Sequence, residues 1–172
     1  MNNLCADIGY KSINHFGEQL CGDHIDVVER DDDSTVIVLA DGLGSGVKAS
    51  ILSTLTSKII STMMAEGLTL SDCVETIAKT LPICSVRGVA YSTFTIMHIV
   101  ENREMELIQY DNPLTILIRD GENYLYPKTK NATPLSKQEY TKHIHFWAAD
   151  AAPYCCSLST ALSNFQTPPY PT

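Results

Sequence analysis

The sequence predicts an α+β domain, in which helices and antiparallel strands occupy separate parts of the chain. Two strand patterns come first and are joined by a short polar connection, and two helix patterns then follow each other directly. From about residue 90 the apolar period changes from helical spacing to two. Because strands do not alternate with helices, a parallel β-α-β sheet is not expected.

The first two strands are expected at 24–30 and 34–41. The second contains an almost continuous apolar run at 36–40, which is typical of a strand that is buried on both faces. The connection between them is the polar segment Asp31–Asp33. So short a connection predicts an antiparallel hairpin.

Two helices are expected next, at about 46–65 and 70–81. Gly67 is the expected stop of the first helix, and Thr69 and Asp72 form a capping-box pattern at the start of the second. In the first helix, apolar residues recur with i, i+4 spacing and are expected to face the core. They are Val47, Ile51, Leu55, Ile59 and Met63, with Leu52 and Ile60 beside them.

The rest of the folded chain is expected to be a meander of strands. The alternating pattern predicts strands at 94–100 and 104–110, then at 114–118 and 124–126. We expect one domain at 1–147 and a Ser/Thr/Pro-rich tail at 148–172, which is poorly ordered because it lacks charge and apolar periodicity.

The composition excludes several classes of protein. The chain has 172 residues, of which 44% are hydrophobic, and its net charge of −8 argues against a nucleic-acid surface. No apolar run approaches the roughly 20 residues that span a bilayer, and no secretory signal pattern is present. The six cysteines form no C-x-x-C pair, so we expect reduced, structural cysteines in a cytoplasmic protein.

The stretch ADGLGSG at 40–46 allows three interpretations. A Walker phosphate loop requires G-x-x-x-x-G-K, and the spacing to Lys48 does not match it. Gly44 to Ala49 matches the dinucleotide pattern G-x-G-x-x-A, but no second parallel strand follows the helix. The third interpretation is a metal ligand, Asp41, at the end of a strand.

Counting across the hairpin supports the metal site. If Asp31–Asp33 is the turn, the numbers of paired residues sum to 64, and Asp41 then faces Asp23. Opposed carboxylates repel each other unless a cation lies between them, and Mg²⁺ or Mn²⁺ prefers such oxygen ligands. Gly42 permits a sharp turn there and offers its carbonyl. The alternative is that both aspartates are solvated strand ends.

The same residues resemble the metal-binding core of the PP2C-type serine/threonine phosphatases, in the sporulation stage II E-like branch. The motifs that carry this resemblance are Cys21-Gly22-Asp23, Ala40-Asp41-Gly42-Leu43-Gly44-Ser45-Gly46, Tyr91-Ser92-Thr93-Phe94, Asn112-Pro113-Leu114 and Ile118-Arg119-Asp120-Gly121. The resemblance covers about residues 4–136.

The resemblance implies an α-β-β-α sandwich of two antiparallel sheets flanked by helices, with a binuclear Mg²⁺/Mn²⁺ centre. Asp23 and Asp41 correspond to its metal-ligating aspartates, and Gly42 to its carbonyl ligand. The resemblance further implies that a metal-bound water hydrolyses phosphoserine or phosphothreonine on a bacterial regulatory protein. An anti-sigma-factor antagonist-like protein is one expected substrate, and a homodimer is compatible with the resemblance.

The chain departs from the family pattern at its C-terminal end. The family's later metal-ligating aspartates have no match here, and Asp150 is the only late acidic candidate. We therefore expect an incomplete C-terminal part and a doubtful second metal. The alternatives are a catalytically impaired domain that binds phosphoproteins, and a nucleotide-binding enzyme.

Overall fold

The computed structural model describes residues 6–14, 16–44, 46–81, 92–101, 104–119, 121–123, 125, 129–132, 139–143 and 156–159. Its elements in chain order are β1 (Asp23–Glu29), β2 (Ser34–Gly42), α1 (Gly46–Ala65), α2 (Leu70–Thr80), β3 (Ser92–Val100), β4 (Glu104–Tyr110), β5 (Ile116–Arg119), β6 (Glu122–Asn123), β7 (Thr129–Ala132), β8 (Glu139–His143) and β9 (Cys156–Ser159).

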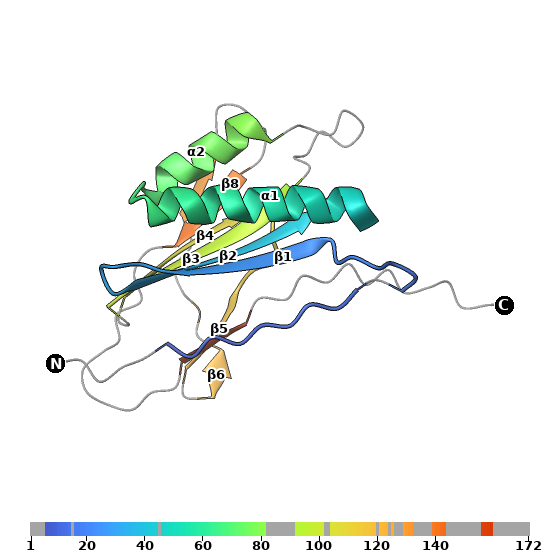
Figure 1. Cartoon of the computed structure of the whole chain (residues 1–172). Helices are drawn as coiled ribbons and strands as arrows, with labels where there is room; N and C mark the ends of the chain where they lie inside the picture. The colour runs from blue at the N-terminus through green and yellow to red at the C-terminus, as the bar shows by residue number, and fades with distance from the viewer. Residues whose placement is uncertain are drawn as a thin grey trace.

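The strands form two antiparallel sheets. The larger sheet has the order β1-β2-β3-β4-β8-β7, and the smaller has the order β6-β5-β9. Both described helices cover one face of the larger sheet, and β5 and β6 lie beyond its other face (Figure 1). The α+β class and the paired antiparallel sheets are thus confirmed, whereas a second helical layer is not among the described residues.

The first hairpin has the register that the sequence predicts. Each pair from Asp23–Asp41 to Glu29–Thr35 sums to 64. The turn closes when the Arg30 N–H donates to the Ser34 carbonyl at 2.8 Å, and Asp33 has a φ of 56°. A three-residue loop that ends in a left-handed residue is a standard hairpin connection, and Asp tolerates that conformation.

The orientation predicted for α1 is wrong over its first half. Val47, Ile51 and Leu55 are 63%, 60% and 48% exposed, although the apolar spacing placed them on the core face. The residues of α1 that are fully buried up to Ser57 are small or hydroxyl-bearing, namely Ala49, Ser53, Thr56 and Ser57. Ile59 and Met63, farther along the stripe, do pack against the core.

The small residues of α1 allow the helix to lie close to the sheet. The hydroxyls of Ser53, Thr56 and Ser57 donate to carbonyls of the preceding turn, so their burial leaves no unpaired donor. At Gly42 a Cβ atom would lie 2.0 Å from the carbonyl oxygen of Ala49, so this packing also requires glycine in β2.

The second helix begins as predicted. Thr69 accepts from the Asp72 N–H, and the Asp72 carboxylate accepts in return from the Thr69 N–H, which completes the capping box. Leu70, Cys73 and Ile77 then join the core between the helices and the larger sheet. Neither described helix is long and apolar enough to span a membrane.

Two apolar clusters lie on opposite faces of the larger sheet. The first contains the α1 and α2 contacts and the stacked rings of Phe94 and Tyr110, whose centroids are 5.0 Å apart. The second joins Met97 and Leu107 of the larger sheet to Leu117 of β5, which establishes that the two sheets pack together. The Asp23–Asp41 face of the hairpin belongs to this inter-sheet side.

The later strands differ in part from the prediction. The strand β5 begins at Ile116 rather than at 114, and β6 occupies 122–123. Residues 124 and 126 of the predicted fourth strand lie outside the described residues. The strands β7 and β8 lie at positions where we predicted no strand, and they extend the larger sheet beyond β4.

The proposed tail can be compared with the structure at four residues only. Residues 156–159 form β9, which pairs with β5 from Ile116 to Arg119. The remainder of 148–172, including Asp150, lies outside the described residues, so the predicted domain division stays a prediction.

Candidate metal centre

The hairpin places Asp23 and Asp41 opposite each other at one end of the larger sheet. Asp23 is the first residue of β1, and Asp41 is the next-to-last residue of β2. Directly paired residues of an antiparallel sheet share a face, and the two carboxyl groups are in hydrogen-bonding contact. The sequence thus predicted both the pair and its register.

Proximity and burial make it costly to ionise both carboxyl groups. Burial raises the pKa of Asp41 to about 7, and the charge of Asp23 contributes to the increase. Burial also raises the pKa of Asp23, while hydrogen bonds with Asp41 and Cys21 lower it. The pair therefore holds a proton near neutral pH, and a bound cation would take the place of that positive charge.

Glycines allow the backbone to pack tightly around this pair. The Gly42 N–H donates to the Gly22 carbonyl at 3.0 Å, which joins the residue before β1 to the end of β2. A Cβ on Gly22 would lie 3.5 Å from the Gly44 carbonyl oxygen and 3.7 Å from that of Gly42. The carbonyls of Gly42 and Gly44 thus lie close to Gly22, the residue before Asp23.

Two neighbours of the pair were not predicted as site residues. The Cys21 sulfur accepts a hydrogen bond from the Asp23 N–H at 3.4 Å, and Thr93 of β3 lies directly opposite Asp41. Cys21 could have been found from its place two residues before Asp23. Thr93 could not, because its position depends on how β3 pairs with β2.

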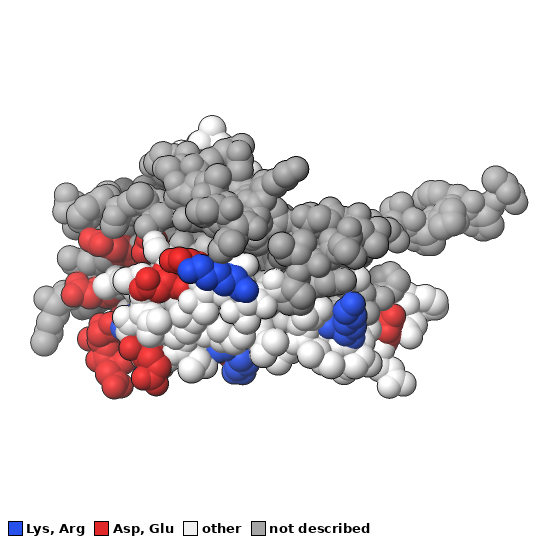
Figure 2. Space-filling model, turned by 90° about the horizontal axis from the view of Figure 1, so that it is seen from above, with Lys and Arg blue, Asp and Glu red and all other residues white. Residues whose placement is uncertain are grey.

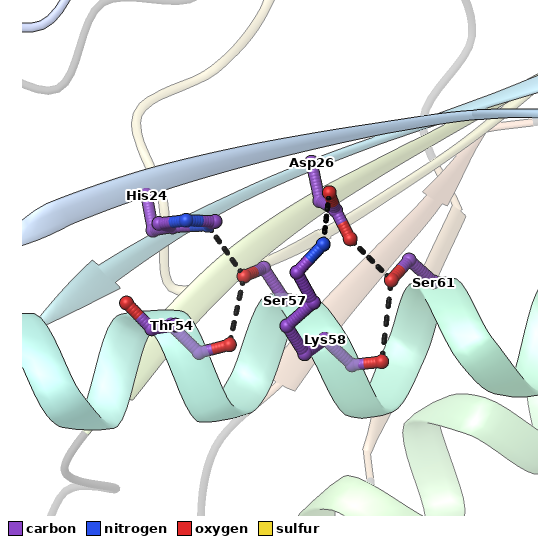
Figure 3. A network of polar contacts seen from close by, with 6 residues as sticks. All are labelled: His24, Asp26, Thr54, Ser57, Lys58 and Ser61. Atoms are coloured by element: carbon purple, nitrogen blue, oxygen red, sulfur yellow. Dashed lines mark hydrogen bonds and ion pairs between the residues drawn. The ribbon is translucent and has the colours of Figure 1, made fainter.

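His24 faces away from the carboxyl pair, as the alternation of the strand predicts. Its Nδ1 lies 2.8 Å from the Ser57 hydroxyl of α1, and Asp26 binds Lys58 and Ser61 two residues farther along (Figure 3). These contacts fasten the edge strand β1 to α1. The geometry thus gives His24 a structural role.

On the face of the protein seen from above the helices, the exposed acidic side chains are unevenly distributed. Seen from the helical side, most exposed acidic side chains gather at the left, the end where Figure 1 places the β1–β2 turn (Figure 2). The end of the sheet that carries Asp41 is the opposite one. On this face, the acidic cluster therefore lies away from the end of the sheet that carries Asp41.

A family model described as "Stage II sporulation protein E (SpoIIE)" matches residues 31–151. The chain belongs to this SpoIIE family. No match was found among curated proteins.

Solved structures share the SpoIIE-family fold at low sequence identity. The RsbU and RsbW domains of Rv1364c from Mycobacterium tuberculosis match with a TM-score of 0.59 at 18% identity, over 77% of this chain and 38% of that one. The PP2C phosphatase domain of SpoIIE from Bacillus subtilis, solved with a fragment of its regulatory domain, matches with a TM-score of 0.59 at 18% identity, over 66% and 34%.

A third structure is RsbX in complex with magnesium. It matches with a TM-score of 0.54 at 21% identity, over 87% of this chain and 65% of that one. The chain therefore has a PP2C-like fold, and it spans less than two thirds of each of these three structures.

The donor set of this SpoIIE-family site suits one hard divalent cation. Two opposed carboxylates are the oxygen ligands that Mg²⁺ and Mn²⁺ prefer. Within the described ranges, no group of three or more His, Cys, Asp or Glu side chains could hold a metal ion. A binuclear centre would need further ligands, and Asp150 lies outside these ranges.

Proposed function

We propose that this chain is a Mg²⁺- or Mn²⁺-dependent phosphatase domain that hydrolyses phosphoserine or phosphothreonine in a protein. The observation that supports it best is the pair Asp23–Asp41, opposed in register and close enough to share a proton. A structural role does not account for such a pair, because opposed carboxylates destabilise a sheet. Membership of the SpoIIE family and the PP2C-like fold support the same reaction class.

In this proposal, the carboxylates of Asp23 and Asp41 and the main-chain carbonyl of Gly42 hold the cation. A cation bound there supplies a water of lowered pKa as the nucleophile. The N-terminus of α1 begins four residues after Gly42 and favours an anion. The Glu18 carboxylate already lies there, because a Cβ on Gly46 would be 2.9 Å from its Oε2 atom. The start of α1 therefore already accommodates a carboxylate.

The substrate and setting are parts of the same proposal. We infer a cytoplasmic phosphoprotein of a bacterial regulatory system, for which an anti-sigma-factor antagonist-like protein is the candidate. A homodimer stays a prediction. The nucleotide-binding alternative loses support, because β2 and β3 are antiparallel neighbours and a dinucleotide fold needs parallel ones.

The test is Mn²⁺-dependent hydrolysis of an aryl phosphate and of a phosphoserine peptide. We expect hydrolysis that is lost on chelation and reduced at least about 100-fold in Asp41→Asn. The matched control is Asp33→Asn, which removes the same charge in the exposed turn at the other end of the hairpin. Equal activity in Asp41→Asn and in the wild type would refute the proposed site.

A second function, phosphoprotein binding without catalysis, is favoured by one observation. The described residues bring together only two carboxylates, whereas a two-metal phosphatase requires more ligands. This candidate predicts that Mn²⁺ binds and that a phosphoserine peptide binds in its presence, with no phosphate released. The same assay therefore separates the two functions.

A further inference from the structure

Polar side chains continue inward from the carboxyl pair across the inter-sheet face. Thr93 and Thr95 of β3 and Gln109 of β4 lie on this face, where the next residues along the strands are Met97 and Leu107. Thr95 is 1% exposed and Gln109 is 2% exposed. Burying a polar group is costly unless it is hydrogen-bonded. The hydrogen-bond partners of these side chains therefore identify the segment that the side chains hold in place.

The partner is the segment that follows β4. The Gln109 side chain donates to the Pro113 carbonyl at 2.7 Å and accepts from the Thr115 N–H at 3.3 Å. Both contacts hold residues 112–115 against the sheet. These contacts thereby hold Asn112 beside β3, close to Thr93, which is paired with Asp41.

Asn112 joins the two threonines of β3. The Thr93 hydroxyl donates to Asn112 Oδ1 at 2.5 Å, and Asn112 Nδ2 donates to the Thr95 hydroxyl at 3.0 Å. Both hydroxyls can donate or accept, and the amide can be turned by 180° without losing either contact. The series of hydrogen bonds can therefore also run in the reverse direction, in which Thr95 donates to Asn112 and Asn112 donates to Thr93.

The direction decides where the Thr93 proton points. In the reverse direction Asn112 donates to the Thr93 oxygen, and the hydroxyl of Thr93 is released to donate elsewhere. Asp41 lies directly opposite on β2, and the Cβ atoms of such pairs are about 5 Å apart. An ionised Asp41 is thus the acceptor that the sheet places next to this hydroxyl.

Asp41 needs such a donor when a cation binds. Among the described side chains, its hydrogen-bond partner is Asp23. Asp23 has no proton to donate once both carboxyl groups are ionised, which cation binding requires. Ligating carboxylates are ordinarily oriented by a hydrogen bond from a second residue.

We propose that Thr93, held by Asn112, is a positioning residue that donates to Asp41 and orients its carboxylate for a divalent cation. This inference rests on the proposed metal-dependent function. It assigns to the segment Asn112–Thr115 a role in metal affinity, because that segment holds Asn112 against the two threonines. The Thr93 hydroxyl acts through Asp41 and needs no contact with the substrate.

The test is the Mn²⁺ dissociation constant, measured by calorimetry on the full chain without substrate. Thr93→Val keeps the side-chain shape and removes the hydroxyl, and we expect 10- to 100-fold weaker binding. Thr93→Ser restores a hydroxyl and is expected to bind within about threefold of the wild type. Thr35→Val is the matched control, since Thr35 is a half-buried residue on the same face of β2 at its other end.

Asn112→Ala is a second variant that leaves the strands unchanged, and we expect binding to weaken in the same direction. If Thr93→Val and Asn112→Ala bind Mn²⁺ like the wild type, the positioning role is wrong and the proposed function stands. An equal loss in Thr35→Val would also overturn the role, because the effect would then be general. A wild type that binds no Mn²⁺ overturns the proposed function together with this inference.

Discussion

Asp41→Asn should make the metal-free protein more stable at alkaline pH while abolishing its metal site. Without a cation, two ionised carboxylates about 5 Å apart repel by about 1 kcal/mol in water and about 3 kcal/mol at an effective dielectric constant of about 20. The rise of the Asp41 pKa from 3.8 to about 7 corresponds to an upper limit of about 4 kcal/mol. Because the Asp41 side chain is only half-buried, solvent screening reduces this upper limit. We therefore expect the free energy of unfolding of Asp41→Asn to exceed that of the wild type by about 1–2 kcal/mol.

The stability gained in Asp41→Asn should increase as the pH rises. The folded wild type keeps a proton at Asp41 up to about pH 7, whereas the unfolded chain releases it near 3.8. The folded state binds more protons between these values, so its free energy of unfolding falls as pH rises through this window. An asparagine has no proton to lose. The advantage of Asp41→Asn should therefore be full at pH 8 and small near pH 4.5.

Urea unfolding in EDTA at pH 8 and pH 4.5 measures this difference, with Asp33→Asn as the charge-matched control. Saturating Mn²⁺ should then stabilise the wild type at pH 8 and leave Asp41→Asn unchanged, because only the wild type has the site. The reasoning is refuted if Asp41→Asn is no more stable than the wild type in EDTA at pH 8. A gain of equal size at both pH values would refute it as well, because repulsion between ionised groups would then not be the cause.

Four other substitutions test the packing and capping of the elements that support the site, each by urea unfolding. Gly42→Ala should cost about 3 kcal/mol or more, because its Cβ would lie 2.0 Å from the Ala49 carbonyl oxygen; a loss below about 1 kcal/mol would contradict this contact. Ile51→Glu should change stability by less than about 0.5 kcal/mol because Ile51 is exposed, whereas Ser57→Leu should cost about 1–3 kcal/mol because Ser57 is buried. A larger loss in Ile51→Glu than in Ser57→Leu would instead support the helix orientation predicted from the apolar stripe. Thr69→Ala should cost about 1 kcal/mol through loss of the capping box, and an unchanged midpoint would argue against that cap.

Local rules were sufficient where the interacting residues are close in sequence. The three-residue turn at Asp31–Asp33 sets the pairing of the hairpin that it closes, so Asp23 and Asp41 could be paired by counting. The capping box of α2 is likewise contained within Thr69 to Asp72. In both cases short-range geometry leaves one arrangement, and tertiary contacts only stabilise it.

The orientation of α1 could not be predicted from apolar periodicity. The rule assumes that the largest apolar side chains face the core, but the backbone of α1 approaches the sheet at Gly42, where only small residues fit. Ala49, Ser53 and Ser57 therefore face inward, and Val47, Ile51 and Leu55 face outward. Distance between packed backbones decided which face was buried, and one sequence does not reveal that distance.

The sequence alone determined the α+β class, the first hairpin and the carboxyl pair, because each depends on residues joined by a short turn or a regular period. Only the tertiary structure decided what surrounds that pair. Thr93 reaches Asp41 through the pairing of β3 with β2, and Asn112 reaches Thr93 across 19 residues. These contacts arise when strands that are distant in sequence meet in one sheet, and their partners become known only once the sheet order is known.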